Sequence, residues 1–130
     1  MNKALIIEDD VWLLEMYQHA LVSDGIEVIS ASSAEAGLAA LDAHLDVNII
    51  ILDMFLPSHS GIEFLHELAS YSDVNELPII ILSSVNKRDF GMTNQRWLHY
   101  GVVEYLYKPD TKPDDLLISV KKQLALVGVK

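Results

Sequence analysis

The chain contains four short apolar segments, and each of them ends at a charged or hydroxyl-bearing residue. The segments and the polar residues that follow them are 4–7 with Glu8 and Asp9, 49–52 with Asp53, 79–82 with Ser83, and 105–107 with Lys108. Short apolar runs bounded by polar residues are typical of strands buried on both faces of a parallel sheet. Ligands of such sheets bind outside the carboxyl ends of the strands. We therefore expect these acids, the hydroxyl and the ammonium group to meet at one edge of a sheet.

Strand-like and helix-like segments alternate along the whole chain. Predicted strands lie near 4–8, 27–30, 49–53, 79–83 and 104–107, and predicted helices lie near 11–23, 33–43, 61–71, 88–99 and 113–126. Gly25 is suited to end the first helix, Ser33 to cap the second, and Pro57 and Gly61 bracket a loop after Asp53. Five consecutive strand–helix units favour an α/β fold, a doubly wound five-stranded parallel sheet with helices on both faces.

Composition narrows the class of protein. The 130 residues are enough for one domain, and we expect a single domain over 1–130 without an output domain. Nine Lys and Arg against 19 Asp and Glu give a net charge of −10, which argues against direct binding of nucleic acid. The chain has no Cys, and we recognise neither a signal peptide nor the roughly 20 apolar residues that span a bilayer. We expect a cytoplasmic protein without membrane contact.

The acidic residues at the predicted sheet edge favour a hard cation. Glu8, Asp9 and Asp53 would repel one another unless a cation neutralised them, and Mg²⁺ prefers one or two carboxylates together with water and phosphate oxygens. Manganese is the alternative cation. Each residue also has an ordinary structural explanation: Asp53 as a strand-end cap, Lys108 as a solvated surface residue, and Ser83 as a strand-end hydroxyl that Ser84 could replace.

Taken together and in order, these residues resemble the receiver domain of two-component response regulators over nearly the whole chain. The motifs that carry the resemblance are Glu8-Asp9, Asp53-Met54-Phe55-Leu56-Pro57 with Gly61 behind it, Ser83, and the segment 101–109 that contains Tyr105, Lys108 and Pro109. The resemblance implies the flavodoxin-like receiver fold with strand order 2-1-3-4-5.

The resemblance also implies a role for each of these residues. Asp53 would be the phosphoacceptor, and Glu8, Asp9, Asp53 and the backbone carbonyl of Phe55 would hold Mg²⁺. Lys108 would pair with the phosphoryl group and Ser83 would bond it. Tyr105 would be the switch aromatic that relays the change to the face formed by helix 88–99, strand 104–107 and helix 113–126.

On this basis the domain would be a phosphorylation-activated switch rather than an enzyme with a separate substrate, although it would assist its own phosphorylation and dephosphorylation. The phosphodonor would be a histidine kinase or a histidine phosphotransfer protein, and the downstream protein is unknown. The sequence leaves open whether the phosphorylated domain forms a homodimer. For docking of the donor we single out Trp12 and Met16, which fall off the inward stripe of the first helix, together with Pro109.

The chain departs from the usual family pattern at several positions, among them Asp110, where an aromatic is common, and Ser84, where a small Ala is more usual. The stretch around 86–100 is a few residues longer than usual. Phe55, two residues after Asp53, and Val85, two residues after Ser83, are both apolar and cannot orient a water molecule for attack on an acyl phosphate. We therefore expect slow spontaneous dephosphorylation, unless Phe55 merely packs over the pocket.

Two alternative functions remain. A degenerate receiver would bind a partner protein without being phosphorylated. A haloacid-dehalogenase-like phosphohydrolase would also use an Asp on a parallel strand, but such enzymes usually have a second Asp two positions later, where this chain has Phe55.

Overall fold

The computed structural model describes residues 2–56, 60–70 and 77–128. The strands are β1 (Lys3–Ile7), β2 (Glu27–Ala31), β3 (Ile49–Leu52), β4 (Ile79–Ser83) and β5 (Val102–Tyr107). The helices are α1 (Val11–Ser23), α2 (Ala34–Ala43), α3 (Gly61–Ala69), α4 (Asn94–His99) and α5 (Pro113–Gly128), with short 3-10 helices η1 (Lys87–Phe90) and η2 (Lys108–Asp110). Pro57 and residue 71 of the predicted third helix lie outside the described residues.

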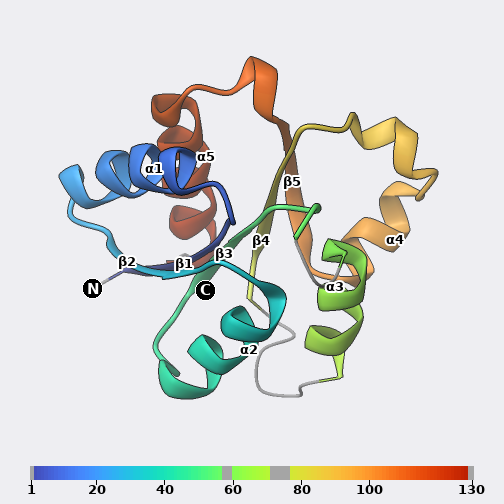
Figure 1. Ribbon diagram of the computed structural model, residues 1–130, viewed down its shortest axis with the longest axis horizontal. Helices are drawn as coiled ribbons and strands as arrows, with labels where there is room; N and C mark the ends of the chain where they lie inside the picture. The colour runs from blue at the N-terminus through green and yellow to red at the C-terminus, as the bar shows by residue number, and fades with distance from the viewer. Residues whose placement is uncertain (1, 57–59, 71–76, 129–130) are drawn as a thin grey trace.

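All strand pairs are parallel, and the sheet order is β2-β1-β3-β4-β5. This confirms the predicted doubly wound α/β fold and its strand order. Figure 1 shows α1 and α5 packed together on one face of the sheet, and α2 and α3 on the other. No helix in the described part of the chain combines the length and the apolar character needed to cross a membrane.

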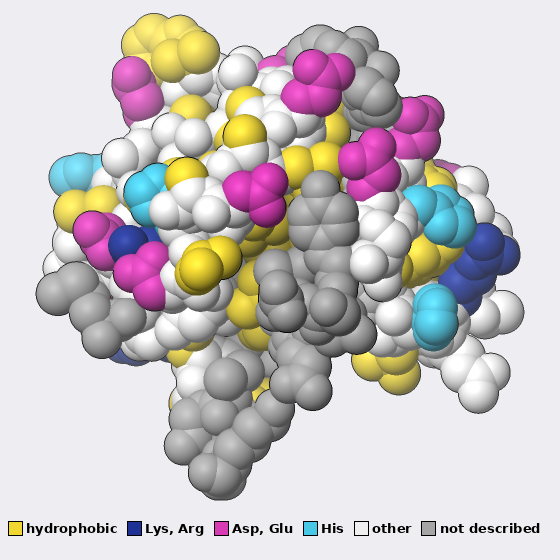
Figure 2. All heavy atoms as spheres, turned by 90° about the horizontal axis from the view of Figure 1, so that it is seen from below, with side chains coloured by type: hydrophobic (Ala, Val, Ile, Leu, Met, Phe, Trp, Pro, Cys, Tyr) yellow, Lys and Arg dark blue, Asp and Glu magenta, His cyan; other side chains and the backbone are white. Residues whose placement is uncertain are grey.

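The sheet separates two apolar cores. One contains Phe64, Leu65 and Trp97 from α3 and α4 against residues such as Ile50 and Ile81. The other contains Tyr17, Leu21, Leu116 and Val120 from α1 and α5 against residues such as Ile51. Alternate residues of the same strand therefore serve opposite cores, which is why the central strands are apolar at consecutive positions. On the α2 and α3 side, acidic side chains make up much of the charged surface, in keeping with the net charge of −10 (Figure 2).

Helix caps account for several boundaries. The side chain of Asp10 accepts from the backbone N–H of Leu13 at 3.2 Å and begins α1, and Ser33 accepts from Ala36 at 3.1 Å and begins α2. Gly25 has a φ of +84° after α1, in the left-handed region that favours glycine. These caps agree with the boundaries predicted at the two helix starts.

The prediction of one continuous helix over 88–99 is wrong. The chain forms η1 first, and Gly91 then takes a φ of +65°, which ends it. The Thr93 side chain accepts from the Arg96 N–H at 3.1 Å and begins α4, which is only six residues long. A left-handed glycine followed by a capping Thr favours two short helices over one long helix, although the surrounding residues suit a helix.

The two buried helical glycines should respond differently to substitution by Ala. A Cβ at Gly61 would lie 2.7 Å from the Met54 Cα and 2.6 Å from its Sδ, whereas a Cβ at Gly37 would lie 2.6 Å from the Cδ1 of Ile7, the end of a flexible side chain. We expect Gly61→Ala to lower the free energy of unfolding by about 1–3 kcal/mol. Gly37→Ala should cost less, because about 1 kcal/mol of helix propensity offsets the contact. Urea unfolding measures both, and an equal or larger loss at Gly37 would contradict this explanation.

Candidate functional site

The acidic residues of the site follow two neighbouring strands. Glu8 and Asp9 come directly after β1, and Asp53 comes directly after β3. Ile7 pairs with Leu52 in the parallel register, and the Asp53 backbone N–H donates to the Ile7 carbonyl at 3.0 Å. The register therefore holds Asp53 beside Glu8 and Asp9, as the sequence predicted.

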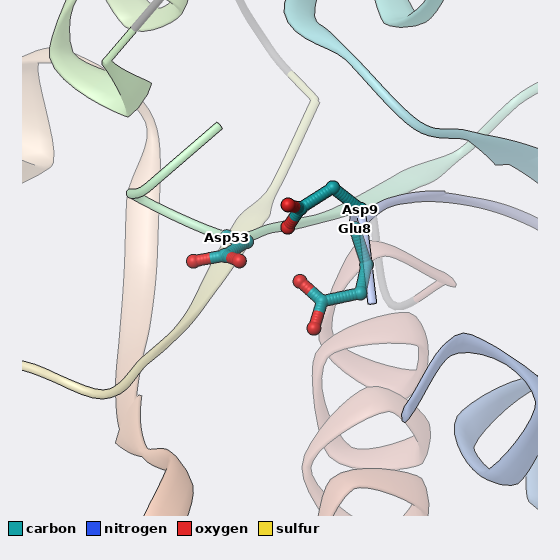
Figure 3. Close-up of side chains that lie close together, drawn as sticks. All are labelled: Glu8, Asp9 and Asp53. Atoms are coloured by element: carbon teal, nitrogen blue, oxygen red, sulfur yellow. The ribbon is translucent and has the colours of Figure 1, made fainter. Parts of the chain in front are cut away.

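The three carboxylates form one cluster. One oxygen of each of Glu8, Asp9 and Asp53 lies within 4.8 Å of the others, and no other group of three or more His, Asp or Glu side chains in the described residues could hold a metal ion. Figure 3 shows the three side chains converging from the ends of β1 and β3. Glu8 is 3% exposed and Asp53 is 5% exposed, whereas Asp9 is exposed, so the cluster is open to solvent only on the Asp9 side.

Lys108 bridges the two buried acids. Its Nζ donates to Glu8 Oε1 at 2.8 Å and to Asp53 Oδ2 at 3.1 Å. Burial raises the pKa of Glu8 to about 8, and the neighbouring Asp53 adds to this shift while Lys108 opposes it. Burial alone would lower the pKa of Lys108, but its contacts with Glu8 and Asp53 outweigh burial and raise it. The ammonium group therefore stays charged between the two acids.

The Phe55 peptide borders the cluster. Its N–H donates to Asp53 Oδ1 at 3.0 Å, so the two Asp53 oxygens have different partners, Phe55 N–H and Lys108 Nζ. These two contacts fix the orientation of the Asp53 carboxylate. The Phe55 ring extends outward and is 51% exposed.

Ser83 ends β4, and Tyr105 lies in the neighbouring strand β5, two residues before its end. Ser83 is fully buried, and its Oγ accepts from the Val85 N–H at 3.1 Å, while Ser84 is exposed. The Tyr105 hydroxyl donates to the Val85 carbonyl at 2.5 Å. Burial raises the pKa of Tyr105, and the Ser83 hydroxyl opposes this shift. The two side chains are thus linked through the backbone of Val85, Ser83 through its N–H and Tyr105 through its carbonyl.

The three predicted docking residues are all on the surface. Trp12 is 79% exposed and Met16 is 47% exposed on α1, and Pro109 is exposed in η2, directly after Lys108. Met16 also lines a hollow of about 410 Å³ between α1 and α5.

Sequence reasoning missed two neighbours of this site. Tyr17 of α1 lies next to Glu8 and Asp53 in the lining of a small internal gap. Phe90 contacts Phe55, with 6.1 Å between ring centroids. No local pattern marks either contact, because both join residues that are far apart in the chain.

The comparisons with known proteins agree with this geometry. A model of the response regulator receiver domain family matches residues 4–121. The transcriptional regulatory protein MalR of Bacillus subtilis is 32% identical over 84% of this chain and 45% of its own length, and KdpE, the KDP operon transcriptional regulatory protein of Escherichia coli, is 34% identical over the same shares. The chain thus spans less than half the length of these two relatives.

Solved structures show the same fold. The chemotaxis protein CheY4 of Vibrio cholerae superposes with a TM-score of 0.82 at 26% identity, over 94% of this chain and 98% of that one. A receiver domain protein of Clostridium thermocellum superposes with a TM-score of 0.82 at 28% identity, over 99% of this chain and 98% of that one. The family match over residues 4–121 and this agreement in fold together establish that the chain belongs to the response regulator receiver domain family.

Proposed function

We propose that this domain is a phosphorylation-activated switch that accepts a phosphoryl group on Asp53 from a histidine kinase or a histidine phosphotransfer protein. The observation that carries the proposal is the position of Lys108 Nζ, which contacts both Asp53 and Glu8 at the edge where the three carboxylates meet. A buried carboxylate with a fixed orientation, a cation beside it and further acids within reach is the set of groups that phosphoryl transfer to Asp requires.

Glu8, Asp9 and Asp53 are the side chains that would hold Mg²⁺, with the Phe55 carbonyl as a further ligand and Mn²⁺ as an alternative ion. The donor set fits a hard cation because all of its members are oxygens. Glu8 Oε2 is also buried and has no hydrogen-bond partner among the described residues, although burying such an oxygen without a partner is unfavourable. When bound, the cation would neutralise charge on the carboxylates and on the incoming phosphoryl oxygens.

In the transfer step, an Asp53 oxygen attacks the phosphorus atom, and a P–O bond forms while the P–N bond to the donor histidine breaks. Lys108 already contacts Asp53, so its ammonium group is in place to pair with the negative charge that moves onto the phosphoryl oxygens. The Phe55 N–H holds the other carboxylate oxygen and limits rotation of the side chain. The domain assists this reaction on itself and does not turn over a separate substrate.

The relay would begin at Ser83. A phosphoryl group on Asp53 offers the Ser83 hydroxyl a stronger acceptor, and Tyr105 would then shift from its contact with the Val85 carbonyl. This would change the face formed by α4, β5 and α5. The donor would dock on Trp12, Met16 and Pro109, which are all exposed. Because the two relatives above are named transcriptional regulators, an effector that controls transcription is a candidate downstream partner.

The two alternatives receive less support. A receiver that binds partners without phosphorylation has no need of a lysine shared between two buried acids, yet Lys108 is held in that position. A phosphohydrolase of the dehalogenase type would need an acid where Phe55 stands.

Phosphorylation itself is the first test. Incubation with Mg²⁺ and a small-molecule phosphodonor should add the mass of one phosphoryl group to the wild-type protein. The adduct should be absent from Asp53→Asn and strongly reduced when the divalent cation is chelated, because the nucleophile or the charge neutralisation is then missing. Intact-mass spectrometry measures all three samples. An adduct of equal yield on folded Asp53→Asn would show that another residue is the acceptor.

The lifetime of the phosphorylated form tests the apolar surroundings of the site. Phe55 is half-exposed and Val85 is partly buried, and neither side chain can hydrogen-bond a water molecule. We expect Asp53 to keep its phosphoryl group far longer than seconds, and Phe55→Asn to shorten this lifetime severalfold by offering a polar group to water. Phe55→Leu is the matched control and should not shorten it. Loss within seconds from the wild-type protein, with no phosphatase present, would refute the prediction.

The raised pKa of Glu8 predicts a pH dependence of stability without divalent cations. In the unfolded chain Glu8 loses its proton near pH 4.5, whereas in the folded protein it keeps the proton up to about pH 8. The folded state therefore binds more protons in this window, and its stability falls as the pH rises. We expect the free energy of unfolding of the wild-type protein to fall by on the order of a few kcal/mol between about pH 4 and about pH 9, relative to that of Glu8→Gln.

Urea unfolding in a chelating buffer at the two pH values measures this difference. Taking the difference between the two proteins cancels the titration of groups that they share. A constant difference across the window would mean that the folded-state pKa of Glu8 is not raised.

A further inference from the structure

Four aromatic rings form a continuous cluster beside the candidate site. They are Phe55, Phe90, Trp97 and Tyr105, and we call them the aromatic cluster. The ring of Phe90 lies 6.1 Å from Phe55, 5.9 Å from Trp97 and 6.1 Å from Tyr105, measured between centroids. Trp97 and Tyr105 are 5.5 Å apart. Phe90 is therefore the ring that contacts the three others, and Phe55 reaches Trp97 and Tyr105 by way of Phe90.

The members of the aromatic cluster come from separate parts of the fold. Phe55 follows β3, two residues after Asp53, while Phe90 ends η1, Trp97 lies in α4 and Tyr105 lies in β5. Figure 1 shows α4 near β5, which is one of the two edge strands of the sheet. The aromatic cluster thus joins the loop after the phosphoacceptor to α4 through ring contacts. Those contacts do not involve the Tyr105 hydroxyl.

Phe55 is tied to the acceptor carboxylate by a direct hydrogen bond. Its N–H donates to Asp53 Oδ1 at 3.0 Å, and a phosphoryl group on Asp53 would change the charge of the carboxylate that accepts this bond. A shift of the Phe55 peptide moves its ring, and the neighbouring ring is Phe90. Phe90 in turn contacts Trp97 edge-on, at an interplanar angle of 86°.

The segment that carries Phe90 and Trp97 is suited to adopt two arrangements. Gly91, directly after Phe90, has a φ of +65° and joins two helices of four and six residues. The indole Nε1 of Trp97 is buried and has no hydrogen-bond partner among the described residues. Because a buried donor without a partner is unfavourable, a packing that gives this N–H an acceptor would gain the free energy of that hydrogen bond.

We propose that Phe90 is a positioning residue that couples the loop after Asp53 to α4. A movement of Phe55, on that loop, would reach Trp97 and Tyr105 through their contacts with Phe90. The inference rests on the proposed function, because it takes phosphorylation of Asp53 as the event that moves Phe55. It adds a second connection to the one through Ser83 and Tyr105. Loss of Phe90 or Phe55 should weaken the response of α4 without preventing phosphorylation.

The fluorescence of Trp97 tests this connection. The chain has two Trp residues, so a Trp12→Phe background leaves Trp97 as the single indole. Emission is recorded before and after treatment with Mg²⁺ and a small-molecule phosphodonor, which does not depend on docking. Intact mass of the same samples gives the phosphorylated fraction, and the change in emission is expressed per phosphorylated molecule.

In this background we expect phosphorylation to change the emission of Trp97. Phe90→Leu and Phe55→Leu should each reduce that change by at least half, and the double variant should lose little more than either single variant, because both act on one connection. Phe90→Tyr, which keeps the ring, should restore the response. Leu98→Ala is the matched control, since Leu98 is on the same helix, 65% exposed and outside the aromatic cluster; it should respond like the background protein.

The outcomes separate the two proposals. If no phosphoryl group reaches Asp53 in the background protein, the proposed function fails and the inference fails with it. If phosphorylation proceeds but Trp97 does not respond, or responds fully in both Leu variants, only the inference is overturned. Phe55 is half-exposed, so Phe55→Leu gives a decisive result even if Phe90→Leu disturbs folding.

Discussion

The common direction of the five strands is the constraint on which the rest of the structure depends. Because β1, β3, β4 and β5 all run the same way, the residue that follows each of them lies at a single edge. Lys108 reaches Glu8 across 100 positions of the chain for this reason. If any one of these strands ran in the opposite direction, its polar residue would lie at the far edge of the sheet. The chemistry of the site is therefore a result of topology before it is a result of individual side-chain contacts.

The same arrangement leaves the edge with an excess of negative charge. Three carboxylates lie close together, and the one ammonium group beside them contacts the two that are almost fully buried. The pKa of Glu8 is raised first by burial and then by the neighbouring Asp53, so its carboxyl group favours the protonated form. An incoming phosphoryl group would add further negative charge at this point. Within the proposed function, a divalent cation is the simplest source of the positive charge that the protein itself does not supply.

The sequence predicted the elements of this edge well and the segment after β4 poorly. Runs such as Ile49–Leu52 favour a buried strand, because four β-branched or apolar residues bounded by polar ones are too short for a typical helix. The strand order came from the family resemblance and not from the residue pattern. The segment 86–100 misled us because its residues suit a helix, while Gly91 and Thr93 divide it. The contact between Phe55 and Phe90 was invisible for a different reason: it depends on where η1 packs, and no local spacing encodes that position.

The division of the interior by the sheet has a consequence for how substitutions combine. The core under α1 and α5 and the core under α2, α3 and α4 share strands but no side chains, since alternate residues of each strand face opposite ways. Side chains on opposite faces rarely share packing partners, so their substitutions act nearly independently on stability. Residues of the core under α1 and α5 can therefore be substituted without disturbing the packing around Trp97, which belongs to the other core.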